Sequence, residues 1–488
     1  MANALVINPP FLEPHRPPIS CAILAELLRL ENINVTVKDF NIELFHKLGN
    51  DKFYDLQVTH TNFPDQTSRE ILKSHAIDQF KDLDLKRYDW ILISCFSIWN
   101  IAVTEQICEL LRPLTRAKIV VGGAGIEYQS TGQNMFKKGL VDYYIYGEAE
   151  QALPALLNGN DRYPGINEIP PLQIQDIELL PLPNYEYFDL KKYDWLLDSP
   201  DVFIYGSRGC VRKCTFCDVE NYWPKYRWRS GQSIANEMIS NYERFGVKNF
   251  FFADSLVNGN LKEFTTMCEI LANYKEGLFR WGSYAIVRPK QAHPAGLFDL
   301  IKASGGKFWS LGIETGVDRI RFDMQKKFTN EDIDWHLEQS QRIGLQNNFL
   351  CMPTWPGETL EEHVEYLNMF ARWQNYAVDG TIYGIRISST LMIIDNTRLS
   401  DQVGKSFEFD YFDDDITVDF KERPWRDSNM SYREKFRRTL ALYEAAIKYK
   451  WPLTNSIQNL NELKQKIDAW TQVQHKLKSK IFVPINKI

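Results

Sequence analysis

The sequence predicts an α/β protein built in three parts, and three observations support this prediction. Short apolar runs alternate with helical spacing over residues 1–160 and again over residues 200–399, as in parallel sheets whose strands are joined by helices. A Pro-rich linker, residues 161–199, separates these regions. Residues 400–488 lack the strand pattern. We therefore expect a doubly wound, Rossmann-like parallel sheet, then a partial (β/α)6 TIM-type barrel, then a small, mostly helical C-terminal cap.

Five strand-like runs define the first part, and each ends in a turn. Helical spacing follows the first run over residues 19–30 and the third run through residue 111. Ligands on such sheets bind beyond the carboxyl ends of the strands. The expected strands are residues 5–7, 35–37, 90–94, 118–121 and 143–146. The candidate ligand-binding residues at their ends are Pro9, Pro10, Ser94, Ser97, Gly122, Gly123, Gly147 and Glu148.

The second part repeats a strand followed by a helix six times, which predicts a partial barrel. The chemistry of such barrels takes place at the carboxyl ends of the strands. The expected strands are residues 201–205, 249–253, 280–287, 308–313, 348–352 and 381–387. The candidate residues at their ends are Cys210, Cys214, Cys217, Asp254, Arg288 and Glu314.

Three cysteines fall in one short loop with the spacing C-x3-C-x2-C, and no obvious fourth ligand lies close in sequence. Three thiolates hold three irons of a 4Fe–4S cluster and leave the fourth iron open for a substrate or cosubstrate. A structural zinc site needs four ligands, and a disulfide leaves one thiol over. The spacing favours the cluster, with zinc or unligated core cysteines as the alternatives.

This loop, with Phe216 directly before the last cysteine, resembles the cluster loop of the radical S-adenosylmethionine (SAM) enzymes. The resemblance implies that the open iron binds SAM and that reductive cleavage yields a 5′-deoxyadenosyl radical. It also implies an electron donor such as flavodoxin or ferredoxin. By this resemblance Phe216 packs by the adenine and Glu314 binds the ribose or the amino group. Arg288 meets the methionine carboxylate, and Asp254 binds SAM or substrate.

Two further segments relate the barrel to this family. The turn Pro356-Gly357-Glu358-Thr359 resembles the family's fifth-strand turn, and we expect Glu358 to cap the helix that follows. After the sixth strand, where many relatives have Pro-Gly-Thr, this chain has Asp395-Asn396-Thr397. The departure concerns the substrate side of the site.

The first part resembles the cobalamin-binding domain that precedes the radical SAM domain in one large class. The similar segments are the opening Asn8-Pro9-Pro10, the loop after Ser94, Gly122-Gly123 and Gly147-Glu148-Ala149-Glu150. The motif Asp-x-His-x-x-Gly is absent, and His15 has a different context. The resemblance therefore implies cobalamin bound without a protein histidine on cobalt. The reaction it implies is methylation of an unreactive carbon of a small molecule, with cobalamin-free rearrangement or oxidation as the alternative.

Two other classes of function compete with this prediction. Methylthiotransferases carry a second cluster on three more cysteines, but Cys108, beside Cys21 and Cys95, falls inside an expected helix. No basic RNA-binding domain ends the chain either. A SAM-sensing module without catalysis is the other alternative, and the full barrel disfavours it.

Composition limits the partners and the compartment. The net charge of -6 argues against general binding to nucleic acid or to anionic membranes. No signal peptide and no apolar run of membrane-spanning length are evident. Eight cysteines, three of them clustered, favour a reducing, cytoplasmic location. We expect the acidic stretch 408–419 and two helices, residues 433–450 and 461–478, to form the cap.

Overall fold

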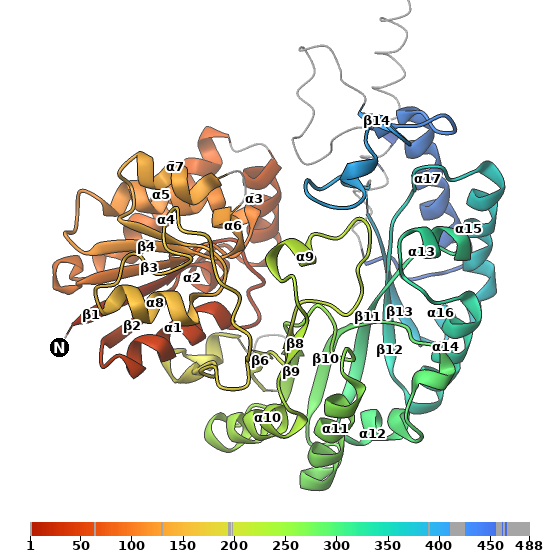
Figure 1. Cartoon of the computed structure of the whole chain (residues 1–488), viewed down its shortest axis with the longest axis horizontal. Coiled ribbons are helices and arrows are strands. Elements are labelled where there is room, and N and C mark those ends of the chain that lie inside the picture. Colours follow the sequence, from red (N-terminus) through yellow and green to blue (C-terminus); the bar gives the residue numbers. More distant parts are fainter. Residues whose placement is uncertain are drawn as a thin grey trace, which may run out of the picture. The chain divides into compact units, whose positions relative to one another are not determined.

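The computed structural model describes residues 2–62, 65–127, 130–193, 197, 199–388, 391–409, 425–454, 461 and 464–465. The chain divides into two compact units (Figure 1). The first consists of Met1–Ser207 and Arg227–Ala253, and the second of Arg208–Tyr226 and Asp254–Ile488. The helix expected over residues 461–478 and most of the acidic stretch 408–419 lie outside the described residues.

A five-stranded parallel sheet of order β2-β1-β3-β4-β5 forms the centre of the first unit and confirms the doubly wound prediction. Its strands are β1 (Asn3–Asn8), β2 (Asn34–Asp39), β3 (Trp90–Ser94), β4 (Lys118–Gly122) and β5 (Tyr143–Ile145). Its helices are α1 (Ile19–Leu30), α2 (Phe40–Leu48), α3 (Asn50–Asn62), α4 (Gln66–Lys81), α5 (Ile101–Leu111), α6 (Ala124–Glu127), α7 (Thr131–Lys137) and α8 (Ala149–Leu157).

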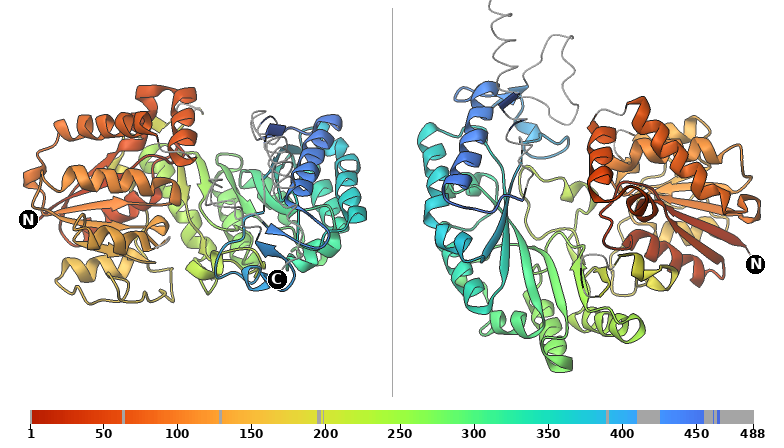
Figure 2. Two further views of the ribbon diagram at one scale, coloured as in Figure 1. Left: turned by 90° about the horizontal axis from the view of Figure 1, so that it is seen from above. Right: turned by 180° about the vertical axis from the view of Figure 1, so that it is seen from behind.

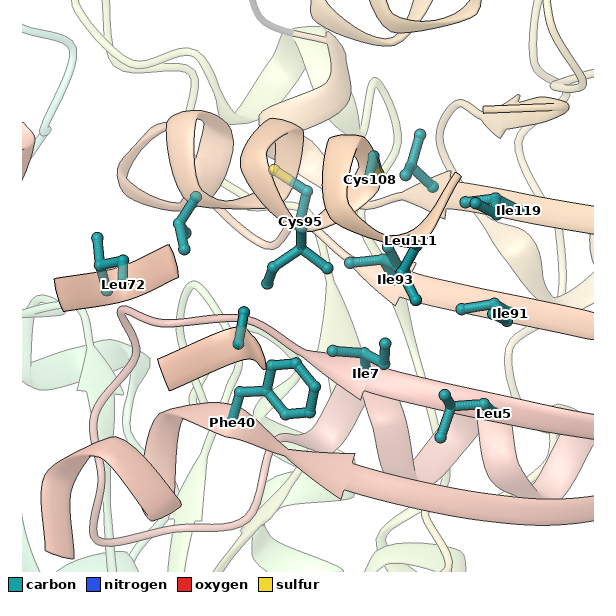
Figure 3. Close-up of a cluster of buried hydrophobic side chains, with 14 of the residues drawn as sticks. Leu5, Ile7, Phe40, Leu72, Ile91, Ile93, Cys95, Cys108, Leu111 and Ile119 are labelled. Carbon is teal, nitrogen blue, oxygen red and sulfur yellow. The ribbon is translucent and has the colours of Figure 1, made fainter. Parts of the chain in front are cut away.

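Alternate residues along each strand point to opposite faces of this sheet, so the unit has two apolar cores. One core joins Leu5, Ile7 and Ile93 to helices α2 to α7 (Figure 3). The other joins Ala4 and Val6 to α1 and α8. Three helices between β2 and β3, α2 to α4, were not predicted. Polar residues dominate α3 and α4, and only one stripe of each contributes to the core, so their apolar pattern is weak in the sequence.

The segment predicted to be a Pro-rich linker packs against the first sheet, and it contains two short 3₁₀ helices, η4 (Tyr185–Tyr187) and η5 (Leu190–Tyr193). Ile166 pairs with Ile145 as an antiparallel bridge, so the segment covers the edge strand β5. Asn167 donates its backbone N–H to Tyr144 O, and its side-chain oxygen accepts from Tyr144 N at 3.0 Å. Covering an edge strand in this way satisfies backbone groups that would otherwise remain unpaired.

The second sheet has six strands in the order β13-β12-β11-β10-β9-β6, as a partial barrel requires. All six strands predicted from the sequence are present. They are β6 (Asp201–Ile204), β9 (Asn249–Phe252), β10 (Arg280–Ala285), β11 (Gly306–Glu314), β12 (Gln346–Cys351) and β13 (Ile382–Ile387). Two short strands, β7 (Ser207–Arg208) and β8 (Arg227–Trp228), flank the cysteine loop and the helix α9 (Val219–Tyr222).

Helices connect these strands, and in the second unit they cover one face of β10 to β13 (Figures 1 and 2). They are α10 (Gly231–Phe245), α11 (Leu261–Lys275), α12 (Leu297–Ala303), α13 (Asp318–Asp323), α14 (Asn330–Ile343), α15 (Leu360–Arg372) and α16 (Gln374–Val378). The ends of these helices are fixed by capping groups. Thr329 and Asp332 form a capping box on α14, and Gly344 ends that helix at φ 77°.

The C-terminal region contributes the hairpin of β14 (Glu408–Phe409) with β15 (Trp425–Arg426) and the helix α17 (Tyr432–Lys448), which matches the basic helix predicted there. Arg438 on α17 donates to Glu358 O at 3.0 Å and lies 3.4 Å from the Glu358 carboxylate. The expectation that Glu358 caps the next helix was wrong. Thr359 and Glu362 form that capping box, whereas Glu358 accepts from Trp355 N and contacts His363. No helix among the described residues is long and apolar enough to cross a membrane.

Candidate functional site

The three clustered cysteines lie on one tight loop between β7 and α9. All three are half-buried, whereas the five other cysteines are fully buried. The Cys217 N–H donates to Cys214 O at 3.2 Å, and the Arg212 N–H donates to Cys210 Sγ at 3.4 Å. Backbone N–H groups directed at sulfur are typical of cluster-binding loops.

Two segments that are distant in sequence, one at Met324 and one at Leu399, hydrogen-bond to this loop. Thr215 donates its N–H to Met324 O at 3.2 Å, and Leu399 donates its N–H to Thr215 O at 2.7 Å. The Asn221 side chain donates to Asp395 O at 3.4 Å. The Asp395-Asn396-Thr397 turn, which departs from the family pattern, therefore lies beside the helix that follows the cysteines.

The electrostatics of the thiols reflect their burial and their mutual proximity. Burial raises the pKa of Cys210 and Cys214, and it raises the pKa of Cys217 to about 11. The charge of Lys326 acts in the opposite direction and lowers the pKa of Cys210 and Cys214. Within the described residues, no three His, Cys, Asp or Glu side chains gather closely enough to hold a single metal ion. The ligands of a zinc ion must converge on one point, whereas each thiolate of a 4Fe–4S cluster binds its own iron, so the three thiols can lie farther apart.

A buried ion pair lies next to the loop. Lys326 Nζ is 2.6 Å from Glu314 Oε1 and 3.2 Å from Gly312 O, and both side chains are 10% exposed. Burial works to lower the pKa of Lys326, but the charges of Glu314 and Cys214 outweigh it and hold that pKa above its usual value. Lys326 also lies 5.5 Å from the centre of the Phe216 ring, which packs edge-on against Trp355.

Glu314 ends β11 with a φ of 66°, in the left-handed region that residues other than glycine seldom adopt. Two contacts to its carbonyl maintain this conformation: Met352 N at 2.8 Å and Tyr366 Oη at 2.8 Å. Strained backbone of this kind concentrates at functional sites, where it aims a side chain. A Cβ at Gly312 would lie 2.5 Å from Glu314 Oε1 and 2.6 Å from Lys326 Nζ, so a larger residue there would displace the ion pair.

The two remaining barrel candidates are placed differently. Arg288 follows β10, and its guanidinium donates to the backbone carbonyls of Asn258 and Gly259 at 2.8–3.0 Å. It therefore braces a loop. Asp254 follows β9 and is 3% exposed, on the strand end where it was expected.

At the carboxyl edge of the first sheet, several of the predicted residues come together. Asn100 donates to Phe11 O at 2.9 Å, and it accepts from the N–H and the hydroxyl of Ser97. It thereby joins the loop of Pro9 and Pro10 to the loop after β3. Gly122 O accepts from Cys95 N at 2.8 Å. At Gly123, where φ is 104°, a Cβ would lie 2.5 Å from Cys95 O.

The other predicted residues of this unit have structural partners. Ser94 is buried and shares a 2.8 Å hydrogen bond with Ser20. The Glu148 carboxylate forms a buried ion pair with Arg227 at 2.8 Å and accepts from Ile174 N. Gly147, at φ 66°, lies against Pro171. The structure thus groups Pro9, Pro10, Ser97, Gly122 and Gly123 at the edge and directs Glu148 to the linker.

The three cysteines of the first part do not form a second site. Cys21 belongs to the core under α1 and α8. Cys95 and Cys108 lie among apolar side chains in the core on the other face of the sheet (Figure 3). Because the sheet separates them, these thiols do not hold a common cluster, which argues against the methylthiotransferase alternative.

Three features of these sites were missed in the sequence. Lys326 lies in a polar turn, where a lysine is typical of solvent exposure. Asn100 carries no motif of its own. Phe96 and Trp99, 50% and 40% exposed on the loop after β3, break the rule that large apolar residues are buried, but only the structure shows this exposure.

Comparison with known proteins finds a known domain in each part of the chain. Residues 204–370 match the radical SAM superfamily, and residues 13–157 match the B12 binding domain. An anaerobic magnesium-protoporphyrin IX monomethyl ester cyclase of Synechocystis sp. is 25% identical over 45% of this chain and 46% of its own length. The hopanoid C-3 methylase of Methylococcus capsulatus is 25% identical over 68% of this chain and 63% of its own. The chain spans about half the length of the curated relatives that it matches.

A solved structure shares the fold. The radical SAM methyltransferase TsrM from Kitasatospora setae, determined with cobalamin and a 4Fe–4S cluster, has a TM-score of 0.63 at 17% identity. The match covers 90% of this chain and 82% of that one.

The fold and the cysteine loop define the class: residues 204–370 form a radical SAM domain. A B12-binding domain, residues 13–157, precedes it in the chain. The matched families imply a 4Fe–4S cluster, SAM and cobalamin as cofactors, and enzymes of this superfamily need a reductant.

Proposed function

We propose that this enzyme reductively cleaves SAM and methylates an unreactive carbon of a small molecule with the help of cobalamin. The observation that carries the proposal is the position of three half-buried cysteines beside the buried Glu314–Lys326 pair. The donor set fits a 4Fe–4S cluster, since three thiols leave one iron free for SAM.

Different residues around the cysteine loop would bind different groups of the cluster and of SAM. Cys210, Cys214 and Cys217 hold the cluster. Lys326, a charged donor held in place by Glu314, is suited to meet the methionine carboxylate. We propose Lys326 in place of Arg288 for that role, because Nε and Nη2 of Arg288 already donate to backbone carbonyls. Glu314 binds the amino group or the ribose hydroxyls, and Phe216 flanks the adenine. When bound, the cluster supplies the electron that cleaves SAM, and cobalamin carries the methyl group.

The carboxyl edge of the first sheet fits a corrin ring. Pro9, Pro10, Ser97, Gly122 and Gly123 present small side chains and backbone there. The exposed Phe96 and Trp99 add the apolar surface that a macrocycle needs. No histidine motif for cobalt is present, so we propose binding without a protein ligand on the metal.

The finer assignments belong to the same proposal. We propose a flavodoxin or ferredoxin as the electron donor, a cytoplasmic location and no nucleic-acid substrate. The net charge of -6 supports the last of these.

The test is the metal content and the products after anaerobic reconstitution with iron, sulfide and hydroxocobalamin. We expect about four irons and one cobalt per chain. We also expect 5′-deoxyadenosine on reduction and transfer of a trideuterated methyl group from labelled SAM. Four irons without cobalt would move the assignment to cobalamin-free rearrangement or oxidation, and about eight irons would revive the methylthiotransferase.

Gly312→Ala tests the SAM side of the site. The new methyl group would collide with both members of the ion pair. We expect SAM affinity, measured by calorimetry on the reconstituted protein, to fall at least tenfold. Overpacking should also cost about 1–3 kcal/mol of stability.

Gly277→Ala is the matched control. Gly277 has a φ of 69° with nothing within 4 Å of a new Cβ. That variant loses stability through backbone strain alone and keeps its SAM affinity. Equal affinities in the two variants would remove Gly312 and the ion pair from the SAM site.

A further inference from the structure

The four strands β10 to β13 of the second unit have two distinct faces. The outer face packs against helices: Trp309 stacks on His336 of α14, and Trp281 meets Phe264 of α11 edge-on. Phe349 likewise packs against Trp373 at the end of α15. Figures 1 and 2 show these helices on one side of the strands. Residues that alternate with these aromatics therefore lie on the opposite, inner face.

Strand register places the inner-face residues in rows, because directly paired residues of parallel strands point to the same side. One row consists of Tyr284, Ser310, Asn348 and Gly384. The next row toward the carboxyl ends consists of Gly312, Leu350 and Arg386.

The surroundings of two glycines agree that these rows lie on the inner face. A Cβ on Gly384 would lie 2.8 Å from Asn348 Oδ1, and a Cβ on Gly312 would touch the Glu314–Lys326 pair. Arg386 therefore shares a row with the glycine that lies directly under that pair.

Arg386 is the one charged side chain among the residues of these two rows. Lys326 is neutralised by Glu314, and Gly312 and Leu350 carry no charge. Arg386 is exposed, and no described residue forms an ion pair or a hydrogen bond with its side chain.

We propose that Arg386 binds a carboxylate or phosphate group of the substrate. This inference rests on the proposed function, because it takes the inner face of the barrel as the place of catalysis. A guanidinium pairs with either anion through two parallel N–H donors. An apolar substrate would instead strip water from Arg386 and leave the charge without a partner, which is unfavourable.

A binding experiment tests the proposal without the reaction. The reconstituted protein is treated with phenylglyoxal, and modified arginines are mapped by mass spectrometry at constant ionic strength. Inorganic phosphate, succinate and neutral succinamide serve as probes. We expect phosphate or succinate, but not succinamide, to slow modification of Arg386 several-fold. Protection by only one anion identifies the group as phosphate or carboxylate.

Arg437 on α17 is the control, since its side chain is 57% exposed and lies 4.0 Å from Glu434. Its modification should respond equally to all three probes. Equal rates at Arg386 with the anions and with succinamide would overturn the proposal.

A second experiment uses turnover. A small-molecule extract is divided by anion exchange and incubated with the enzyme and trideuterated SAM. We expect methylated product from the retained, anionic fraction, reduced about 10- to 100-fold in Arg386→Gln and partly restored in Arg386→Lys. Product from the unretained fraction alone would refute the anion assignment while the proposed function stands. Absence of 5′-deoxyadenosine would refute the proposed function, and the binding experiment still decides the role of Arg386.

Discussion

Replacing Cys217 with alanine should abolish SAM cleavage and remove most of the iron from the reconstituted enzyme. Three thiolates anchor the cluster, so loss of one leaves two irons without a protein ligand. The five other cysteines are poor substitutes, because burial raises the pKa of each thiol and disfavours the thiolate that binds iron. Iron and sulfide analysis, electron paramagnetic resonance of the reduced protein and chromatography of 5′-deoxyadenosine measure the effect.

Cys268→Ala provides the comparison for this experiment. Cys268 is a buried thiol of α11 whose pKa burial raises to about 12, and it lies outside the loop. That variant should keep about four irons per chain and its SAM cleavage. Full iron content and normal cleavage in Cys217→Ala would instead show that the loop does not bind the cluster.

Lys326→Met should destabilise the protein and abolish measurable SAM binding. Lys326 is 8% exposed and Glu314 is 7% exposed, so removal of the ammonium leaves a buried carboxylate without its partner. Breaking a buried pair in this way costs about 3–5 kcal/mol. Urea unfolding measures stability, and calorimetry with SAM measures affinity.

The double variant Lys326→Met with Glu314→Gln separates the structural role from the binding role. Removing both charges relieves the unpaired carboxylate, so most of the stability should return. SAM affinity should stay lost, because neither the ammonium nor the carboxylate is present. Recovery of both properties would show that the pair is only structural.

Arg319→Met is the surface comparison for the pair. Arg319 is 51% exposed and pairs with Glu362. Loss of that pair should cost less than about 1 kcal/mol, since water screens the charges.

The strands and the cysteine loop could be predicted because the signals that specify them are local. Alternation of apolar runs with helical spacing located every strand of both sheets. The spacing of Cys210, Cys214 and Cys217 predicts the cluster chemistry, and turn residues placed Asp254, Arg288 and Glu314 at strand ends. Each of these signals lies within about ten residues of chain, so neighbouring side chains carry it completely.

The partners of those residues could not be predicted, because they come from distant parts of the chain. Glu148 is a loop residue in sequence, yet Arg227, which is 79 residues away, makes it part of a buried ion pair. The sequence predicted Glu358 to be a helix cap, but in the structure Glu358 forms an ion pair with Arg438 of α17. In both cases burial changes the role of a carboxylate, and burial depends on packing that no local pattern encodes.

The sequence by itself determined the fold class and the positions of the strands along the chain, and its cysteine spacing predicts the chemistry of the loop. Only the tertiary structure decided which cation faces Glu314, which arginine is already engaged, and which side of β13 carries Arg386. The physical reason is that periodicity and spacing act between chain neighbours, whereas strand register and buried ion pairs depend on how distant segments pack.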